Sequence, residues 1–192
     1  MEHTYNLSAS SILLSLNLMS LFETITSLRA VRHFTKRRLS NETLTRILQA
    51  GRWTGSAKNV EPWHFIVIRD KDTLNKLSKC GRYASHISGA DTAIVIASER
   101  SHFASFDIGR ASQNMMLAAW GEGVGSCIAS LHYESQARTI LDVPENKDIQ
   151  IAISFGYPLP NQPLTIEGRP REEVLANIGR RPLKDLVHWE KW

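Results

Sequence analysis

Five basic side chains crowd a ten-residue stretch near the start of the chain, and their spacing suggests what they could bind. The stretch covers residues 29–38 and contains Arg29, Arg32, Lys36, Arg37 and Arg38. Such a run is most often a solvated surface, and it could also bind nucleic acid. Two arginines three residues apart at the end of a helix, however, present two guanidinium forks to one compact dianion. A long polyanion would need a longer stripe with interleaved aromatic residues, so a phosphate monoester is the favoured ligand.

Three glycines at alternate positions, Gly121, Gly123 and Gly125, have the spacing of a dinucleotide-binding loop. A phosphate-binding glycine loop leaves a strand and enters a helix, so that the helix N-terminus faces the anion. Here the helical pattern comes first and the strand second, which indicates a helix end followed by a tight turn. The sequence also contains neither a P-loop nor a GxSxG elbow, so it does not favour those two chemistries.

Seven histidines and two cysteines are the candidate metal ligands. The histidines form neither an HxH nor an HExxH pattern, and Cys80 and Cys127 are 127 − 80 = 47 positions apart. Zinc sites bring their ligands in closely spaced pairs, so we expect no metal ion. We also expect no disulfide framework and a reducing, cytoplasmic compartment.

Length and composition fit one ordinary globular domain. The chain has 192 residues, of which 42% are hydrophobic and 22% charged, and 23 basic against 19 acidic residues give a net charge of +4. Intrinsic disorder would require lower hydrophobicity and a higher net charge. The weak positive field favours small anions without requiring nucleic acid.

The first 18 residues are expected to be an N-terminal extension that is disordered or follows from an upstream start codon. The chain begins Met-Glu-His, which lacks the positive start of a secretory signal, and its apolar patch at residues 12–16 is far too short to span a membrane. A clean amphipathic pattern begins after Met19. We therefore expect the domain to occupy residues 19–192.

Hydrophobic periodicity predicts the elements that must position the basic residues. We expect helices from residue 21, after Ser40, and at residues 70–79, 107–120, 134–141 and 172–177. Strands are expected at residues 63–68, 92–97 and 126–130, and at residues 149–155 with one buried face. Helices and strands alternate without regular βαβ spacing, which predicts an α+β fold with a mixed central sheet covered by helices.

Several segments, taken in order, resemble the nitroreductase family of FMN-dependent oxidoreductases. The resemblance covers about residues 20–192, and the ordered set is more specific than any one motif. Arg29–Phe34 resembles the family's Arg-Ser-Val-Arg-x-Phe turn, and Trp53–Trp63 its Trp-Ala-Pro-Ser-x-x-Asn-x-Gln-Pro-Trp segment. The other similar pieces are Asp107 with Gln113–Met115, Gly123–Cys127, and Arg180–Leu183 with Val187 and His188.

The resemblance implies an obligate, domain-swapped homodimer with two flavin sites in the subunit interface. Residues implied to bind the FMN phosphate and its surroundings are Arg29, Ala30, Arg32, Arg180 and Arg181. A phosphate dianion is well matched by several forked guanidiniums. Gly55, Ser56 and Asn59 are implied to reach the flavin from the partner, and Ile128, Ala129 and Ser130 to lie along the ring with their backbone groups.

The chain departs from the family pattern at several of these positions. Ala30 stands in place of a serine, Gly55 in place of a proline and Glu61 in place of a glutamine. These changes remove individual contacts without removing the basic residues that a phosphate needs. The short chain leaves no room for additional lid helices, so an open pocket is expected.

The implied activity is the reduction of an electron-poor acceptor, such as a nitroaromatic or a quinone, with NADH or NADPH as the donor. Both substrates would use one flavin site in turn, and the flavin would carry the hydride chemistry. No side chain is therefore named as catalytic. A flavin-binding carrier or sensor without turnover is the alternative, and a nucleic-acid-binding module is a third possibility. We expect a small-molecule partner, no nucleic acid and no membrane.

Overall fold

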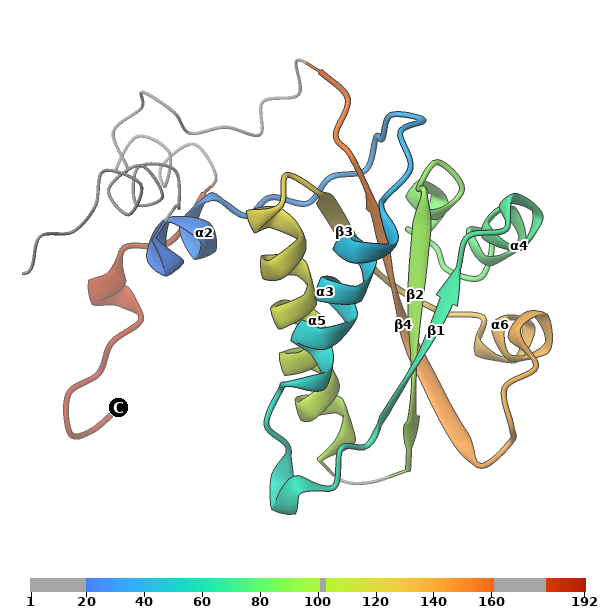
Figure 1. Cartoon of the computed structure of the whole chain (residues 1–192). Helices are drawn as coiled ribbons and strands as arrows, with labels where there is room; N and C mark the ends of the chain where they lie inside the picture. Colours follow the sequence, from blue (N-terminus) through green and yellow to red (C-terminus); the bar gives the residue numbers. More distant parts are fainter. Residues whose placement is uncertain (1–19, 101–102, 161–178) are drawn as a thin grey trace, which may run out of the picture. The chain divides into compact units, whose positions relative to one another are not determined.

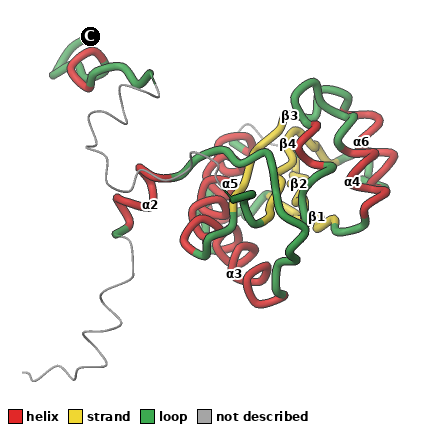
Figure 2. The backbone as a smooth tube through the Cα atoms, turned by 90° about the horizontal axis from the view of Figure 1, so that it is seen from above, coloured by secondary structure: helices red, strands yellow, loops and turns green. Residues whose placement is uncertain are grey.

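The computed structural model describes residues 20–100, 103–160 and 179–192. The chain divides into two compact units, Met1–Gln162 and Pro163–Trp192. The described part of the first unit has three layers, with a four-stranded sheet between two pairs of helices (Figures 1 and 2). Its helices are α2 (Leu21–Ser27), α3 (Asn41–Arg52), α4 (Lys71–Leu77), α5 (Ala104–Gly121) and α6 (Glu134–Leu141). Its strands are β1 (Trp63–Ile68), β2 (Thr92–Glu99), β3 (Gly125–Ser130) and β4 (Lys147–Gly156).

Local capping explains where three of the helices begin. Ser20 and Glu23 form a capping box at the start of α2, with the Ser20 hydroxyl accepting from the Glu23 N–H. The Ser40 side chain accepts from the Thr43 N–H at 3.0 Å, and Asp70 caps α4 in the same way at 2.8 Å. The N-cap predicted at Ser40 is confirmed.

The sheet has the strand order β1-β2-β4-β3, and all three pairings among these strands are antiparallel. The expectation of a mixed sheet was therefore wrong for the described strands. The only parallel pairing recorded among the described residues is an isolated bridge between Ala30 and Ser126. The sequence pattern could not distinguish these arrangements, because strand direction depends on connections that periodicity does not report.

The central position of β4 corrects a second expectation. Between residues 149 and 155 large apolar residues occupy every second position, with Gln150, Ala152 and Ser154 between them, which predicted one buried face. In the structure, residues 152–156 are all buried, because β2 and β3 flank the strand and helices cover both faces. The polar residue Ser154 is completely buried in this stretch.

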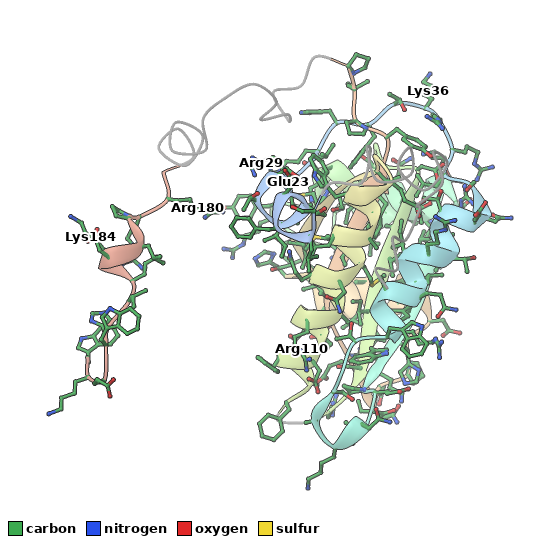
Figure 3. All side chains as sticks on the ribbon, turned by 60° about the vertical axis from the view of Figure 1, so that its left-hand side comes forward. Glu23, Arg29, Lys36, Arg110, Arg180 and Lys184 are labelled. Atoms are coloured by element: carbon green, nitrogen blue, oxygen red, sulfur yellow. The ribbon has the colours of Figure 1, made fainter. Side chains whose placement is uncertain are left out.

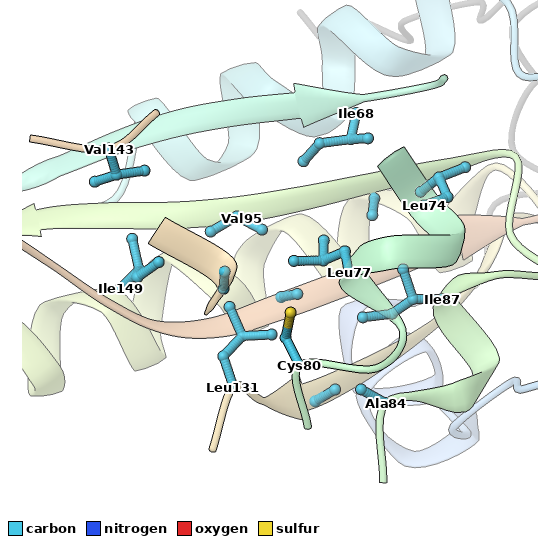
Figure 4. Packing of buried hydrophobic residues seen from close by; sticks show 14 of the residues in the cluster. Ile68, Leu74, Leu77, Cys80, Ala84, Ile87, Val95, Leu131, Val143 and Ile149 are labelled. Carbon is cyan, nitrogen blue, oxygen red and sulfur yellow. The ribbon is translucent and has the colours of Figure 1, made fainter. Parts of the chain in front are cut away.

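Two hydrophobic cores lie on opposite faces of the sheet. One contains Leu74, Leu77 and Ile87 packed against Val95 and Ile149 (Figure 4). The other packs side chains of α3 and α5 against β2 and β4 and includes Ile47, Met115, Ile94, Ile153 and Phe155. Each fully buried aliphatic side chain contributes about 1.5–3 kcal/mol through removal of its surface from water.

An extended segment, residues 30–39, crosses one end of the sheet, and we call it the crossing segment. It bridges to β3 at Ala30, pairs with Pro158 through Phe34, and donates the Leu39 N–H to Asp91 at 3.1 Å. Phe34 lies so close to Gly156 that a Cβ there would stand 2.8 Å from its ring. The crossing segment is therefore fixed at van der Waals distance from the strand ends.

The strands and helices predicted within the described residues are present with small shifts in their ends, and β1 has the predicted bounds. The helix expected at residues 172–177 and the extension at residues 1–18 lie outside the described residues. None of the helices in the described ranges combines the length and the apolar character needed to cross a membrane.

Candidate functional site

The first part of the candidate site is the backbone turn that follows α2. Helix α2 ends at Ser27, so Arg29 and Arg32 lie in extended chain rather than on a helix end. Arg29 is half-buried, and its Nη1 donates to the carbonyls of Thr26 (2.9 Å) and Leu28 (2.8 Å). Its Nη2 is buried and has no hydrogen-bond partner among the described residues. The carbonyls of Thr26 and Leu28 thus hold Arg29 through Nη1, and both N–H groups of Nη2 are left for another group.

The turn is attached directly to the first residues of β3. Ala30 bridges to Ser126, and the Val31 N–H donates to the Ser126 carbonyl at 2.9 Å. A Cβ on Gly125 would lie 2.5 Å from Cγ2 of Val31, so only glycine allows this approach. The Ser126 hydroxyl is buried and, like the Arg29 Nη2, lacks a partner in the part of the chain that is described.

Arg32 is exposed beside this attachment. Among the ion pairs of the described residues, no carboxylate pairs with either Arg29 or Arg32. The backbone bridge at Ala30 and Val31 thus brings the segment that carries the two arginines to Ser126 at the start of β3, and we call Arg29, Arg32 and Ser126 the anion cradle. Guanidinium forks and a hydroxyl suit a phosphate, which offers acceptor oxygens to each of them.

A buried polar chain lies behind the anion cradle and was missed by the sequence reasoning. His86 is 6% exposed, and its Nδ1 lies 2.8 Å from Oγ of Ser154, which in turn donates to the Cys127 carbonyl at 3.2 Å. Because Ser154 has only one hydroxyl proton, we assign the proton between the two side chains to His86 Nδ1. The Nε2 lone pair is then buried without a partner.

Arg32 influences both titratable groups of this chain. Burial lowers the pKa of His86 below its usual value, and the charge of Arg32 lowers it further. Burial raises the pKa of the Cys127 thiol, and Arg32 opposes that rise. Because 68 positions separate His86 from Ser154, no local motif could have revealed the pair.

The second part of the candidate site is the loop between α3 and β1. Gly55, Ser56 and Asn59 lie in this loop, whose 3-10 turn η1 spans Ala57–Asn59. Lys58, Asn59 and Glu61 all adopt left-handed backbone conformations, with φ of 53°, 55° and 47°. Such conformations cost about 1–2 kcal/mol per residue for ordinary side chains, and they concentrate at functional sites.

Helix α5 holds this loop through two polar contacts. The buried Asp107 carboxylate accepts the Ala57 N–H at 3.2 Å and lies 3.6 Å from the Arg110 guanidinium. The Asn114 side chain donates to the Thr54 hydroxyl at 2.7 Å. The sequence singled out Asp107 only as part of a long helix, so its role as an anchor for the loop is a further finding.

The two parts of the candidate site attach to opposite ends of α5. Trp120, near the C-terminal end, donates its indole N–H to the Ser27 hydroxyl at 2.9 Å, whereas Asp107 holds Ala57 near the other end. Thirteen residues of α-helix separate the two anchors, which corresponds to about 20 Å. Figure 3 shows Arg29 and Arg110 toward opposite ends of α5.

Strand β3 carries the remaining predicted residues of the first unit. Ile128 and Ser130 are exposed, whereas Ala129 between them is buried in the core with Leu77 and Cys80. The strand thus presents one open face next to the anion cradle. That the backbone of residues 128–130 follows a flavin ring stays a prediction.

Arg180 and Arg181 belong to the second unit and are both exposed. Within that unit a 3-10 turn, η3, spans Leu183–Asp185, and the rings of His188 and Trp192 stack at 4.3 Å between centroids. The approach of Arg180 and Arg181 to Arg29 and Arg32 stays a prediction. Across residues 20–100, 103–160 and 179–192, no group of three or more His, Cys, Asp or Glu side chains could hold a metal ion.

Comparison with solved structures defines the class of fold. An FMN-dependent nitroreductase from Clostridium difficile superposes with a TM-score of 0.76 at 23% identity, covering 88% of this chain and 98% of the other. The NADPH:FMN oxidoreductase of Vibrio harveyi in complex with NAD+ superposes with a TM-score of 0.73 at 22% identity, covering 90% and 77%. The protein therefore has the nitroreductase fold.

Sequence comparison then identifies the family. The nitroreductase family model matches residues 25–80 and 78–157, and the chain therefore belongs to the nitroreductase family. A protein of Archaeoglobus fulgidus, provisionally named NADH dehydrogenase/NAD(P)H nitroreductase, is 29% identical over 175 residues, covering 85% of this chain and 94% of the relative. The family predicted from the ordered motifs, and with it the oxidoreductase class, is confirmed.

Proposed function

We propose that the protein is an FMN-dependent oxidoreductase that uses NADH or NADPH to reduce nitroaromatic, quinone or similar electron-poor acceptors. The observation that carries the proposal is the anion cradle, in which Arg29 Nη2 and Ser126 Oγ are buried donors without partners and Arg32 lacks a carboxylate. Buried polar groups are normally satisfied, so such a cluster at the start of one strand favours an anionic ligand. The Clostridium difficile and Vibrio harveyi proteins, whose names include FMN, support the choice of that cofactor.

In this proposal the chain's own residues bind and orient the cofactor. Arg29 and Arg32 hold the phosphate beside Ala30 and the Ser126 hydroxyl, and Arg180 and Arg181 add positive charge from the tail. The backbone of Ile128, Ala129 and Ser130 follows the ring along the open face of β3. When bound, FMN supplies the hydride chemistry between the donor and the acceptor, so no side chain is required as a nucleophile or base.

The proposal includes a homodimer whose two sites lie in the interface. Ala57, which follows Ser56, is anchored at Asp107, about 20 Å along α5 from the Trp120 contact with the turn that carries Arg29, and this separation supports a site completed by a second chain. A two-fold dimer with antiparallel α5 helices would place the loop of one chain beside the anion cradle of its partner. Domain swapping of the tail belongs to the same proposal.

The domain boundaries and the compartment complete the proposal. Residues 19–192 form the FMN-binding domain, and residues 1–18 are a dispensable extension, so a chain that starts at Met19 retains the flavin. A cytoplasmic location is favoured by the two free, buried cysteines, Cys80 and Cys127.

The test is an absorption spectrum of the freshly purified protein, recorded anaerobically before and after addition of NADH and, separately, NADPH. We expect a two-banded flavin spectrum that bleaches with at least one donor and recovers on addition of a quinone. A flavin spectrum that neither donor bleaches would indicate a carrier or sensor without turnover. Absence of flavin after incubation with FMN would overturn the proposal.

A further inference from the structure

The crossing segment also borders a second basic site at its far end, near β1 and β2. A cavity of about 650 Å³ opens between residues 34–38, the junction of β1 with α4, and the residues before β2. Four cationic side chains line it: Lys36, Arg38, Arg69 and Lys71. The Asp91 carboxylate is the only acidic side chain among the described residues that line it.

Asp91 is already fully engaged by the protein. It is 7% exposed, and its Oδ2 accepts from the Leu39 N–H, the Arg69 Nη2 and the Thr92 hydroxyl at 3.0–3.1 Å. Its Oδ1 lies 3.6 Å from the Nε of Arg38. One carboxylate therefore balances one of the four positive charges, which leaves an excess of three in the cavity wall.

The other cations have few partners that compensate their charge. Lys71 donates to the Ala90 carbonyl at 2.6 Å, which leaves two ammonium protons and the whole charge available. Arg69 is tied to the Leu39 carbonyl and to Asn41, but its Nε is buried without a partner. Lys36 makes no ion pair within the described residues. Cations held around one concave wall repel one another, and an anion in the cavity would relieve that repulsion.

We propose that this cavity is a second anion site, which binds a phosphorylated small molecule carrying at least two negative charges. Its volume lies in the range of small-molecule pockets, and the hydroxyls of Thr35 and Ser88 in its wall add donors for phosphate oxygens. A concave wall of this size suits a compact ligand, whereas a nucleic acid would need an extended basic surface.

The cavity is distinct from the anion cradle. It lies at β1 and β2, while the cradle lies at β3, and β4 separates β2 from β3. Figure 3 shows Lys36 and Arg29 at well separated places on the first unit. The inference does not depend on the proposed function, because none of the cavity cations belongs to the cradle.

The test measures binding of inorganic pyrophosphate by calorimetry in the Arg32→Glu background, where the anion cradle is disabled. We expect saturable binding of one pyrophosphate per chain. Lys36→Glu and Lys71→Glu should each weaken it by about tenfold or more, as loss of a charge-assisted contact implies. Within the described part of the chain Lys36 makes no hydrogen bond or ion pair, so its variant stays informative if Lys71→Glu lowers stability.

Lys79→Glu is the matched control, since it makes the same charge change on an exposed lysine outside the cavity, and it should change affinity by less than about twofold. No saturable binding up to about 10 mM pyrophosphate would overturn the inference, since such an affinity is below about 3 kcal/mol. Equal losses in all three lysine variants would also overturn it, because they would indicate a diffuse field. If the protein bound duplex DNA in a salt-sensitive manner but did not bind pyrophosphate, the basic surface would be a nucleic-acid-binding surface, and the proposal of a small-molecule site would be wrong.

Discussion

The two ends of α5 hold two different kinds of structure. At the C-terminal end, a turn is fixed to β3 by a backbone bridge, close glycine packing and a half-buried arginine, and it leaves donors unused. At the N-terminal end, a buried carboxylate holds a loop with three left-handed residues, and the amide of Asn114 in the middle of the helix also binds the loop. The rigid end is suited to fixing an anion, whereas the strained loop is suited to shaping a contact surface. Because the turn and the loop are held at separate places on α5, each can be changed by a substitution of its own, and chains that carry different substitutions can be mixed in one dimer.

The largest effect is expected from Arg32→Glu, which places a negative charge in the anion cradle. FMN should be retained on the order of 100-fold more weakly, because one charge-assisted contact is lost and a repulsive one is gained. Flavin content after purification and the Kd for added FMN measure the change. Arg37→Glu is the control, since Arg37 lies 3.9 Å over the ring of Tyr157 and outside the cradle. If Arg32→Glu retained as much flavin as the wild type, Arg32 would not bind the FMN phosphate.

A mixed dimer would show whether the two ends of α5 act together across subunits. Gly55→Trp should block the loop surface without unfolding the chain, because Gly55 is exposed and its nearest neighbour is the flexible end of Arg110. Refolding an equal mixture of Arg32→Glu and Gly55→Trp chains should restore about a quarter of the wild-type sites, since half the dimers are mixed and each has one intact site. If both groups serve a site within one chain, the mixture would stay as inactive as its parents.

Asp107→Ala removes the carboxylate that holds the loop between α3 and β1 to α5. Loss of this buried acceptor leaves the Ala57 N–H without its partner, so unfolding free energy should fall by about 1–3 kcal/mol. Quinone reductase activity should fall further than flavin content, because the cradle is untouched. Asp148→Ala, which removes a partly exposed ion pair with Arg100 at 3.1 Å, should cost less than about 1 kcal/mol in denaturant unfolding. Similar losses in the two variants would argue against a special role for Asp107.

Gly125→Ala disturbs the contact between the turn after α2 and the start of β3 through packing alone. The new methyl group would meet Val31 at 2.5 Å, so stability should fall by about 1–3 kcal/mol and FMN affinity should fall with it. Gly121→Ala, where the added carbon has nothing within 4 Å, should be neutral or stabilise the end of α5 by up to about 1 kcal/mol. Thermal unfolding with and without FMN separates the two effects. Full FMN affinity in Gly125→Ala would show that the turn position does not matter.

The smallest effect concerns the acid side of the pH profile. Since burial and Arg32 lower the pKa of His86, the unfolded chain binds a proton below about pH 6.5 that the folded chain does not. Stability should therefore decrease as the pH falls through that window, by at most about 1.4 kcal/mol per pH unit. His86→Asn should flatten this slope in urea unfolding between pH 5 and 7. If the unfolding free energy of His86→Asn depended on pH as steeply as that of the wild type, groups other than His86 would cause the dependence.

Regular elements could be predicted where one local signal decided them. A continuous apolar run after Pro62 predicted β1 with its final bounds, and the side chain of Ser40 predicted the start of α3. The start of α5 was placed three residues late, because its N-cap, Phe103, makes no side-chain cap that a pattern could reveal. Strand direction was wrong because it depends on long connections.

The candidate site was predictable only in part for the same physical reason. Arg29 and Arg32 stood out by type and spacing, but the buried hydroxyl of Ser126 and the pair of His86 with Ser154 arise from strand pairing. Lys58 and Glu61 gave no local sign of left-handed backbone, since glycine and asparagine are the residues that favour it. The buried carboxylate of Asp107 was likewise hidden in a helical pattern.

The bond between Trp120 and Ser27 gives the molecule its own optical reporter. The indole N–H donates to a hydroxyl two residues before Arg29, so release of α2 would move this ring into water. Tryptophan emission shifts to longer wavelength on hydration. Subtracting the emission of a Trp120→Phe variant from that of the wild type would isolate the Trp120 signal from that of the other four tryptophans. Stopped-flow fluorescence could then time the assembly of the α2 turn without an attached dye.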